Sequence, residues 1–585
     1  MSGDVPSEPS VQQWITAKIG SLGGPSIRRY AARAGLDPDF PGTWLDLASS
    51  CADDGLLDLG AVAALDHALS RWPDDAVLRV RAALYEFLSG QDQAALARLA
   101  PLTEQDAAAA VLALRIEKAN GGFQREEVAR AADLVINLLP WGEPHDDFIT
   151  FCRTSGLGEL ALQFLLQWIR HRGQDSYVRR RVGELMLELG YLPNASAVFQ
   201  QEWALWPVVA DLIGPWSGVP DVSAGDEAEV EAEIEHAFAI PESELVHHPL
   251  PDDGLDLAGV TVMYLGASKT GNAVGNDIAQ HFQAAAAAAG GCLHAWFDSS
   301  LCSVNEARID DRQALARVDS FVAELERVKP DILLLDAQNQ PTLRSMTEDM
   351  LLSLKRRLGF RLVLVVRDAL LALDTQLRLR AAVADKLIVF DPCSYVFASD
   401  QPDLARISLA IPVPALHAPF VPKSGHPQRQ LTFVGSTHGQ HRSFLLSVLA
   451  TADIGLEMVV GPDRAVKVPT QDDFAALLAD SRAVLNVAAH DVGVAGMLVT
   501  GRVWEAIGAG SLLVEQPYEG TMRFFTPWRH FLPWREPADI IRRWRVLSRR
   551  EDLRRKIADE AHAWACRHYG IDRVWRAVVT HAMRK

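Results

Sequence analysis

A glycine recurs at intervals of 32 to 35 residues through the first third of this 585-residue chain, at positions 55, 90, 122, 156 and 190. An alanine follows three of these glycines by five residues, at 95, 161 and 195, and a proline follows three of them by 17 or 18 residues, at 73, 140 and 207. Glycine permits the turn between two helices, and proline ends the second helix because it lacks an N–H. This period predicts a stack of helix pairs.

The pattern resembles the tetratricopeptide repeat over roughly residues 40–210, although the first and third units lack the alanine. An irregular helical bundle is the alternative. Stacked helix pairs form a curved surface that usually binds segments of other proteins. We therefore predict an N-terminal segment at 1–39 and an α-helical, TPR-like repeat solenoid at 40–215, whose role is recognition of a protein.

Charge separates the chain into parts. The net charge is −18, which disfavours nucleic acid as a partner because neutralising phosphates needs a basic surface. Residues 221–256 hold twelve Asp or Glu and no Lys or Arg, so we expect an acidic helix and a linker at 216–258. Residues 541–585 hold 13 Lys or Arg against 5 Asp or Glu. This basic tail is a solvated helix face, or it contacts either the acidic segment or anionic lipid at a membrane surface.

The N-terminus carries no secretory signal, and no apolar run is long enough to span a membrane. The six cysteines are scattered and form no CxxC pair, which indicates reduced thiols without structural zinc. We expect a cytoplasmic protein.

The last 325 residues alternate apolar runs with helical patterns. Continuous apolar strands between helices predict a parallel sheet that is covered on both faces. One series of strands falls within 259–422 and a second within 430–585. We predict two Rossmann-like, doubly wound domains that face each other across a cleft. Ligands of such sheets bind at the carboxyl ends of the strands.

Two loops have the composition of anion sites. The first strand ends in GASKTGNAVGND, where Gly266 and Gly271 have phosphate-loop spacing but the Lys-Ser/Thr pair is missing. It is either a ligand loop, with Lys269 and Arg367 as further phosphate or acceptor contacts, or a plain tight turn. The second series opens with FVGSTHGQHR. There Gly435, Ser436 and Arg442 make a candidate diphosphate site beside a helix N-terminus, unless the arginine is an ordinary surface residue.

Residues 500–516 read TGRVWEAIGAGSLLVEQ, a short apolar helix that contains Glu505, then a Gly-Ala-Gly stop and an apolar strand. With LNVAA upstream, this stretch resembles the C-terminal module of the spore-maturation CgeB-like glycosyltransferases, which have the GT-B fold. The resemblance covers about 430–570 well and 259–420 only in its strand–helix rhythm. The residues on matching positions are Asn486, Arg502, Glu505, Ala506, Gly508 and Gly510, with Trp504 in place of the family's Phe.

The resemblance implies that Glu505 accepts hydrogen bonds from the ribose hydroxyls of a nucleotide sugar and that Thr500 caps its helix. It also implies catalysis without a metal or another cofactor. The remaining matching positions become candidate donor-binding residues. Many retaining enzymes of this class carry a second acid eight residues earlier, where this chain has Met497. The retaining or inverting outcome therefore stays open.

A catalytic base is expected from the first of the two sheets, to deprotonate an acceptor hydroxyl. Asp277 and Asp368 are the candidates, with Asp391 as a third, and each has a structural role as its alternative. The leading hypothesis is a glycosyltransferase that modifies a protein Ser or Thr recruited by the repeats, since a solenoid fused to this module resembles bacterial flagellin-type glycosyltransferases. The alternatives are a cell-envelope glycan glycosyltransferase, a repeat scaffold with a degenerate nucleotide-sugar module, and a sugar-nucleotide epimerase.

Overall fold

The computed structural model of the chain describes residues 37–584 except for 38, 54, 173–174, 204–215, 217, 222, 253, 255, 258, 267–277, 297–307, 337–347, 367–380, 398–401, 424, 438–439, 462–466 and 491–495.

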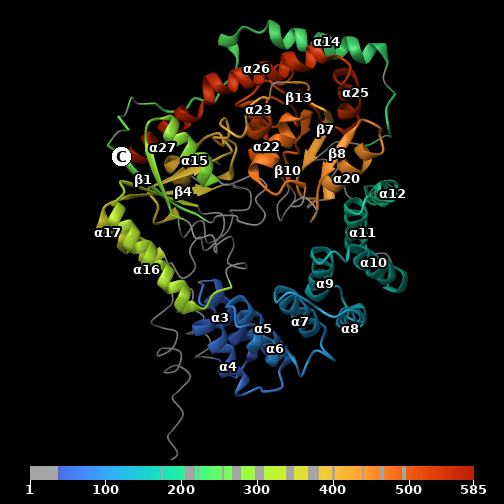
Figure 1. Ribbon diagram of the computed structural model, residues 1–585, viewed down its shortest axis with the longest axis vertical. Helices are drawn as coiled ribbons and strands as arrows, with labels where there is room; N and C mark the ends of the chain where they lie inside the picture. Colours follow the sequence, from blue (N-terminus) through green and yellow to red (C-terminus); the bar gives the residue numbers. More distant parts are fainter. Residues whose placement is uncertain are drawn as a thin grey trace, which may run out of the picture.

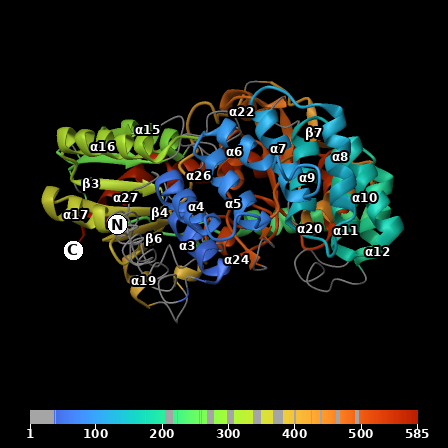
Figure 2. The ribbon, with the colours of Figure 1, turned by 90° about the horizontal axis from the view of Figure 1, so that it is seen from below.

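Residues 41–203 form five helix pairs, which we call the helical array. The pairs are α3 (Pro41–Asp53) with η1 (Leu57–Val62) and α4 (Ala63–Leu69), α5 (Ala76–Leu88) with α6 (Asp92–Leu99), α7 (Ala107–Ala119) with α8 (Arg125–Ile136), α9 (Glu143–Thr154) with α10 (Gly158–Arg172), and α11 (Ser176–Glu188) with α12 (Leu192–Trp203). Figures 1 and 2 show them stacked one after another in an arc. The predicted helical N-terminal region is confirmed, whereas its identity as a tetratricopeptide array stays a prediction.

The turns inside the pairs follow the glycine spacing. Four of the predicted glycines have φ between 72° and 84°, a left-handed conformation that favours glycine: Gly55, Gly90, Gly156 and Gly190. In the third pair the left-handed glycine is Gly121, with φ 99°, and not the predicted Gly122. The three spaced alanines, Ala95, Ala161 and Ala195, have no exposed surface, as close helix packing requires.

The first α/β domain holds a parallel sheet of order β2-β1-β3-β4-β5-β6. Its strands are β1 (Thr261–Leu265), β2 (Cys292–Trp296), β3 (Ile332–Asp336), β4 (Arg361–Val366), β5 (Lys386–Val389) and β6 (Ser408–Ala410). Its helices are α15 (Ile278–Ala288), α16 (Asp311–Val328), α17 (Glu348–Leu358) and α19 (Pro402–Ile407). The predicted first series of strands is confirmed by β1 to β5, whereas β6 was not predicted because three residues are too short for a recognisable apolar run.

The second α/β domain holds a parallel sheet of order β13-β12-β9-β7-β8 and a small hairpin of β10 and β11. Its strands are β7 (Arg429–Val434), β8 (Leu456–Val459), β9 (Ser481–Leu485), β10 (Ala489–His490), β11 (Gly496–Met497), β12 (Leu512–Glu515) and β13 (Leu532–Pro533). Its helices are α20 (Gln440–Ala450), α22 (Gln471–Ala479), α23 (Gly501–Gly508), α24 (Glu519–Met522), α25 (Pro537–Leu547) and α26 (Glu551–Tyr569). Two parallel sheets were predicted and are confirmed.

The last helix, α27 (Ile571–Met583), crosses back to the first α/β domain. Its Trp575 ring lies 6.1 Å from the ring of Phe282 on α15, and His581 hydrogen-bonds to the carbonyl oxygen of Ile407 at 2.9 Å. The chain therefore links the two domains twice, once by the segment before β7 and once through α27.

An acidic helix, α14 (Ala224–Ala239), lies along α25 and α26 on the outer side of the second domain (Figure 1). Arg550 donates to Glu227 at 3.4 Å and to Glu231 at 3.3 Å. Of the two partners proposed for the basic tail, the structure thus shows the acidic segment.

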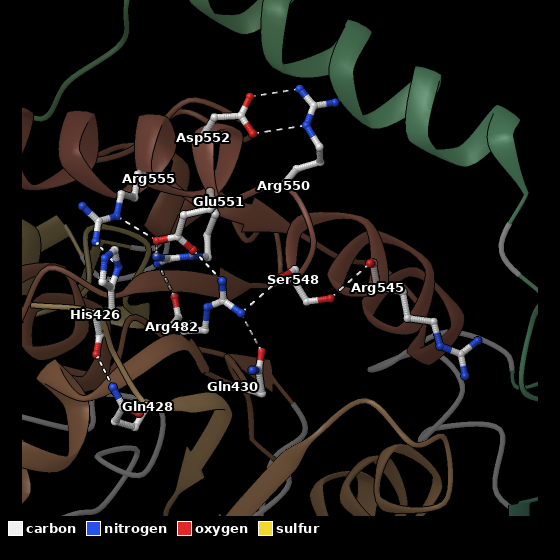
Figure 3. Close-up of polar contacts among 11 residues, drawn as sticks. His426, Gln428, Gln430, Arg482, Arg545, Ser548, Arg550, Glu551, Asp552 and Arg555 are labelled. Atoms are coloured by element: carbon white, nitrogen blue, oxygen red, sulfur yellow. Dashed lines mark hydrogen bonds and ion pairs between the residues drawn. The ribbon is translucent and has the colours of Figure 1, made fainter.

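An arginine cluster anchors α26 to the sheet and to the segment before β7 (Figure 3). The carboxylate of Glu551 accepts hydrogen bonds from Arg482 at 2.6 Å, from Arg554 and from Arg555 at 2.8 Å. Arg555 also reaches Nδ1 of His426 at 3.2 Å. Burial opposes ionisation of Glu551, but these hydrogen bonds outweigh it and hold its pKa at about 2. The cluster fixes the point where the chain enters the second domain.

Candidate functional site

Each sheet has one point where the chain reverses its winding direction. In the first sheet β1 lies between β2 and β3, and in the second sheet β7 lies between β8 and β9. The carboxyl ends of strands on either side of such a point form the ligand crevice of doubly wound sheets. Three predicted residues stand there: Gly266 directly after β1, Gly435 directly after β7 and Asn486 directly after β9.

The loop after β7 is shaped by Arg442. This arginine is the third residue of α20, and its Nη1 donates to both the carbonyl oxygen and the hydroxyl oxygen of Ser436 at 3.3 Å. Gly435 donates its N–H to the carbonyl oxygen of Val459 at 3.2 Å. A Cβ at Gly435 would come within 2.9 Å of the ring of Phe433, so a larger residue would require that ring to move. The predicted diphosphate residues are thus brought together at one strand end.

Glu505 lies on α23 with 1% of its surface exposed. Nε of Arg502, one turn earlier, stands 3.8 Å from Oε2 of Glu505. The Arg502 guanidinium also lies over the ring of Phe474, 4.3 Å from the ring centroid, which is a cation–π geometry. The predicted acid, which is buried, and the predicted arginine, which is partly exposed, therefore form one ion pair beside the second sheet.

Asn486 belongs to a chain of hydrogen bonds at the same strand ends. Thr500 Oγ1 donates to Asn486 Oδ1 at 3.0 Å, and Asn486 Nδ2 donates to Glu515. The prediction that Thr500 caps α23 is wrong in one respect. Thr500 occupies the N-cap position but makes no side-chain cap hydrogen bond, and its hydroxyl donates instead to Oδ1 of Asn486.

Glu515, the last residue of β12, was not among the predicted residues. It has no exposed surface, and burial raises its pKa to about 8 although hydrogen bonds from Asn486 and Gln516 oppose the rise. The available signal was an acid at the end of the apolar run SLLVEQ. Its partner Asn486 belongs to a different strand, so the run alone did not reveal the pair.

Gly508 and Gly510 face the segment that joins the two domains. A Cβ on Gly508 would stand 3.3 Å from the carbonyl oxygens of Ala415 and Phe420, and a Cβ on Gly510 would stand 2.9 Å from Pro422. Their observed effect is to let this segment pass close to the end of α23. Their contact with a donor stays a prediction.

The first domain contributes two carboxylates near strand ends, Asp336 at the end of β3 and Asp391 after β5. Tyr264 donates its hydroxyl to Oδ2 of Asp336 at 3.2 Å, and the Tyr264 ring fills the space beside Gly266, where a Cβ would come within 2.3 Å. Asp336 is 1% exposed and ends β3 at the reversal point. The sequence analysis does not single out Asp336, because the apolar run DILLLDA at 331–337 by itself indicates only a strand.

Asp391, a candidate base, bridges the two domains. Its Oδ1 accepts from the N–H of Cys393 at 2.8 Å, and its Oδ2 accepts from the N–H of Val499 at 3.3 Å and the hydroxyl of Tyr518 at 3.1 Å. Burial raises the pKa of this carboxyl. Both oxygens are engaged in holding the strand end against the turn before α23, which favours the structural alternative. The other first-domain candidates, Lys269, Gly271, Asp277, Arg367 and Asp368, lie outside the described residues.

No group of three or more His, Cys, Asp or Glu side chains is placed to hold a metal ion in the part of the chain that the structure describes. No helix there is both long enough and apolar enough to cross a membrane.

One family of known proteins matches part of the chain. Residues 427–580 match the family of glycosyl transferase-like proteins. No curated protein matches the chain.

Several solved structures are similar to this chain at low identity. The Anabaena protein HepE in complex with UDP-glucose is 13% identical and aligns over 55% of this chain and 98% of its own, with a TM-score of 0.38. An O-GlcNAc transferase of Thermobaculum terrenum is 11% identical over 96% of this chain and 98% of its own, with a TM-score of 0.35. Sucrose-phosphate synthase of Thermosynechococcus elongatus is 10% identical over 55% and 98%, with a TM-score of 0.39.

Proposed function

We propose that this chain is a GT-B glycosyltransferase that moves a sugar from a nucleotide-sugar donor to an acceptor hydroxyl. The observation that carries the proposal is the buried acid Glu505 paired with Arg502 on α23, inside the region that matches the glycosyl transferase-like family. The closer resemblance to the CgeB-like branch stays a prediction.

The donor has two parts that need different chemistry. An ionised carboxylate has lone pairs for two ribose hydroxyls and no competing proton, which suits Glu505. A diphosphate needs fixed cations and backbone N–H groups, which suits Arg442 and the loop after β7. The same groups would neutralise the leaving diphosphate without a metal. Asn486, fixed by Thr500 and Glu515, is a further candidate for a donor contact.

We propose that the acceptor is a Ser or Thr of a protein recruited by the helical array. Support comes from the form of the array, since stacked helix pairs commonly bind polypeptide segments. Asp277 and Asp368 remain the proposed bases. A base contributes about 10²–10⁴-fold to rate, so Asp277→Asn or Asp368→Asn should lower kcat by that range and leave donor affinity unchanged. A glycan acceptor and a scaffold without activity are the competing outcomes.

The deciding experiment is a thermal-shift screen of nucleotide sugars on the full-length chain. A donor at 100 times its Kd stabilises the folded state by about 2.7 kcal/mol, which is readily detected. Glu505→Gln keeps the shape of the buried side chain but removes its charge, so the shift should disappear. Glu519→Gln is the matched control, because Glu519 is an exposed acid on α24. This substitution should leave the donor-induced thermal shift unchanged.

The possible results separate the hypotheses. A shift that survives in Glu505→Gln contradicts the assignment of the donor site to α23, and no shift with any donor favours the scaffold. When a donor binds, nucleotide release is measured with and without candidate acceptors. A transferase releases nucleotide only with its acceptor, whereas an epimerase converts the sugar and releases none.

A further inference from the structure

The helical array contacts the loop after β7 through one buried carboxylate. Glu188, the last residue of α11, has a side chain that is 4% exposed. Thr437 Oγ1 donates to its Oε1 at 2.7 Å. From the other side, Nε of Arg153 on α9 donates to its Oε2 at 2.9 Å, and Nη2 of the same arginine donates to Oε1. This two-point guanidinium contact fixes the direction of the carboxylate.

The same side chain also touches the loop after β8. Gly461 there has φ 70°, and a Cβ on it would come 3.2 Å from Cγ of Glu188. Behind this contact, apolar residues of α11 and α12 share one buried cluster with those of α20, among them Phe199 and Phe444. Glu188 is therefore a hydrogen-bonding group beside an apolar cluster, where a polar partner sets the relative position of the two surfaces.

Thr437 belongs to the same short loop as Gly435 and Ser436. It is 3% exposed. Its carbonyl oxygen accepts a hydrogen bond from Ser443 Oγ at 2.6 Å, while Arg442 binds Ser436. The loop is thus held by α20 on one side and by Glu188 of the helical array on the other.

We propose that Glu188 is a positioning residue of the donor site, so that the helical array completes the loop that binds the donor diphosphate. This inference rests on the proposed donor role of Gly435, Ser436 and Arg442. Sites of this kind work only when the binding groups are held within about 0.5 Å of their productive positions. Docking of the array and donor binding are then energetically linked, and by reciprocity a partner that shifts α11 changes donor affinity.

The test measures donor Kd by calorimetry on full-length variants, with the donor found in the thermal-shift screen. Glu188→Ala and Thr437→Val each remove one side of the same hydrogen bond, and each should weaken donor binding about tenfold. The double variant should be no weaker than the worse single one, because both changes remove one interaction. Glu188→Gln keeps an oxygen that accepts from Thr437 and should recover part of the affinity. The kcat at saturating donor should stay within about twofold, since Glu188 contacts no reacting group.

Asp311 provides the matched control. It is a second fully buried carboxylate at the junction of the array with an α/β domain, and it accepts from the N–H groups of Leu57 at 2.9 Å and Leu59 at 2.7 Å. It lies on α16 of the first domain and binds the first helix pair of the array, whereas Glu188 lies in the last pair. Asp311→Ala should leave donor Kd unchanged.

The outcomes are distinguishable. Unchanged donor Kd in Glu188→Ala and Thr437→Val overturns the inference, and so does an equal loss in Asp311→Ala, which would indicate general loosening of the array. If Glu505→Gln abolishes donor binding while the Glu188 variants do not affect it, this inference alone fails. If Glu505→Gln binds donors like the wild type, the proposed donor site on α23 fails, and if no donor binds the wild type, the proposed function fails. Should Glu188→Ala not fold, the near-isosteric Thr437→Val decides.

Discussion

Glu515 makes the stability of the second α/β domain depend on pH in an unusual direction. Its folded-state pKa is about 8 against an ordinary value of 4.5. Below pH 4.5 the carboxyl is protonated in both the folded and the unfolded chain. Between 4.5 and 8 only the unfolded chain ionises, so the free energy of unfolding falls as pH rises. The slope is about 1.4 kcal/mol per pH unit, and over the whole interval the loss is about 5 kcal/mol.

Glu515→Gln cannot ionise and should lack this loss. The difference in free energy of unfolding between the variant and the wild type should therefore grow steadily as pH rises from 4.5 to 8. The structure allows the substitution, because an amide flip of Asn486 restores its hydrogen bond to position 515. The assay is guanidinium unfolding followed through the buried Trp504 and Trp534, at several pH values in that interval. Glu519→Gln, which removes an exposed acid, is the control and should follow the wild type. Parallel pH profiles of the wild type and Glu515→Gln would refute the reasoning.

Three further predictions concern the site and its surroundings. Asp391→Asn should lower kcat by less than about a hundredfold, because the carboxylate is engaged in structural hydrogen bonds; a larger loss in steady-state assays would mark it as the general base. Phe474→Leu removes the cation–π contact of Arg502, worth about 1 kcal/mol, and should raise donor Kd severalfold. An unchanged Kd in calorimetry would contradict a role for Arg502 in donor binding. The hydrogen bond from His562 lowers the pKa of the Cys566 thiol, so iodoacetamide should label Cys566 faster in the wild type than in His562→Gln, and equal labelling rates by mass spectrometry would contradict that pairing.

The second domain illustrates how far local signals reach. The helix at α23 was predictable because its start, its apolar face and its glycine stop lie within eleven consecutive residues, 500–510. The apolar strands were predictable for the same reason, since burial on both faces selects a continuous run of side chains. Short strands such as β6 and β13 escaped, because two or three residues carry too little pattern and are held by their neighbours in the sheet.

The sequence by itself determined the helix pairs, the two sets of strands and the position of Glu505, because glycine turns, proline stops and apolar runs act over a few residues. Only the tertiary structure decided what those residues touch. The Thr500 hydroxyl donates to Asn486 and makes no cap hydrogen bond to its own helix, and burial between strands raises the pKa of Glu515. Thr437 donates a hydrogen bond to Glu188, which lies 249 positions earlier in the chain. Such contacts depend on how whole domains pack, and no pattern of neighbouring residues encodes them.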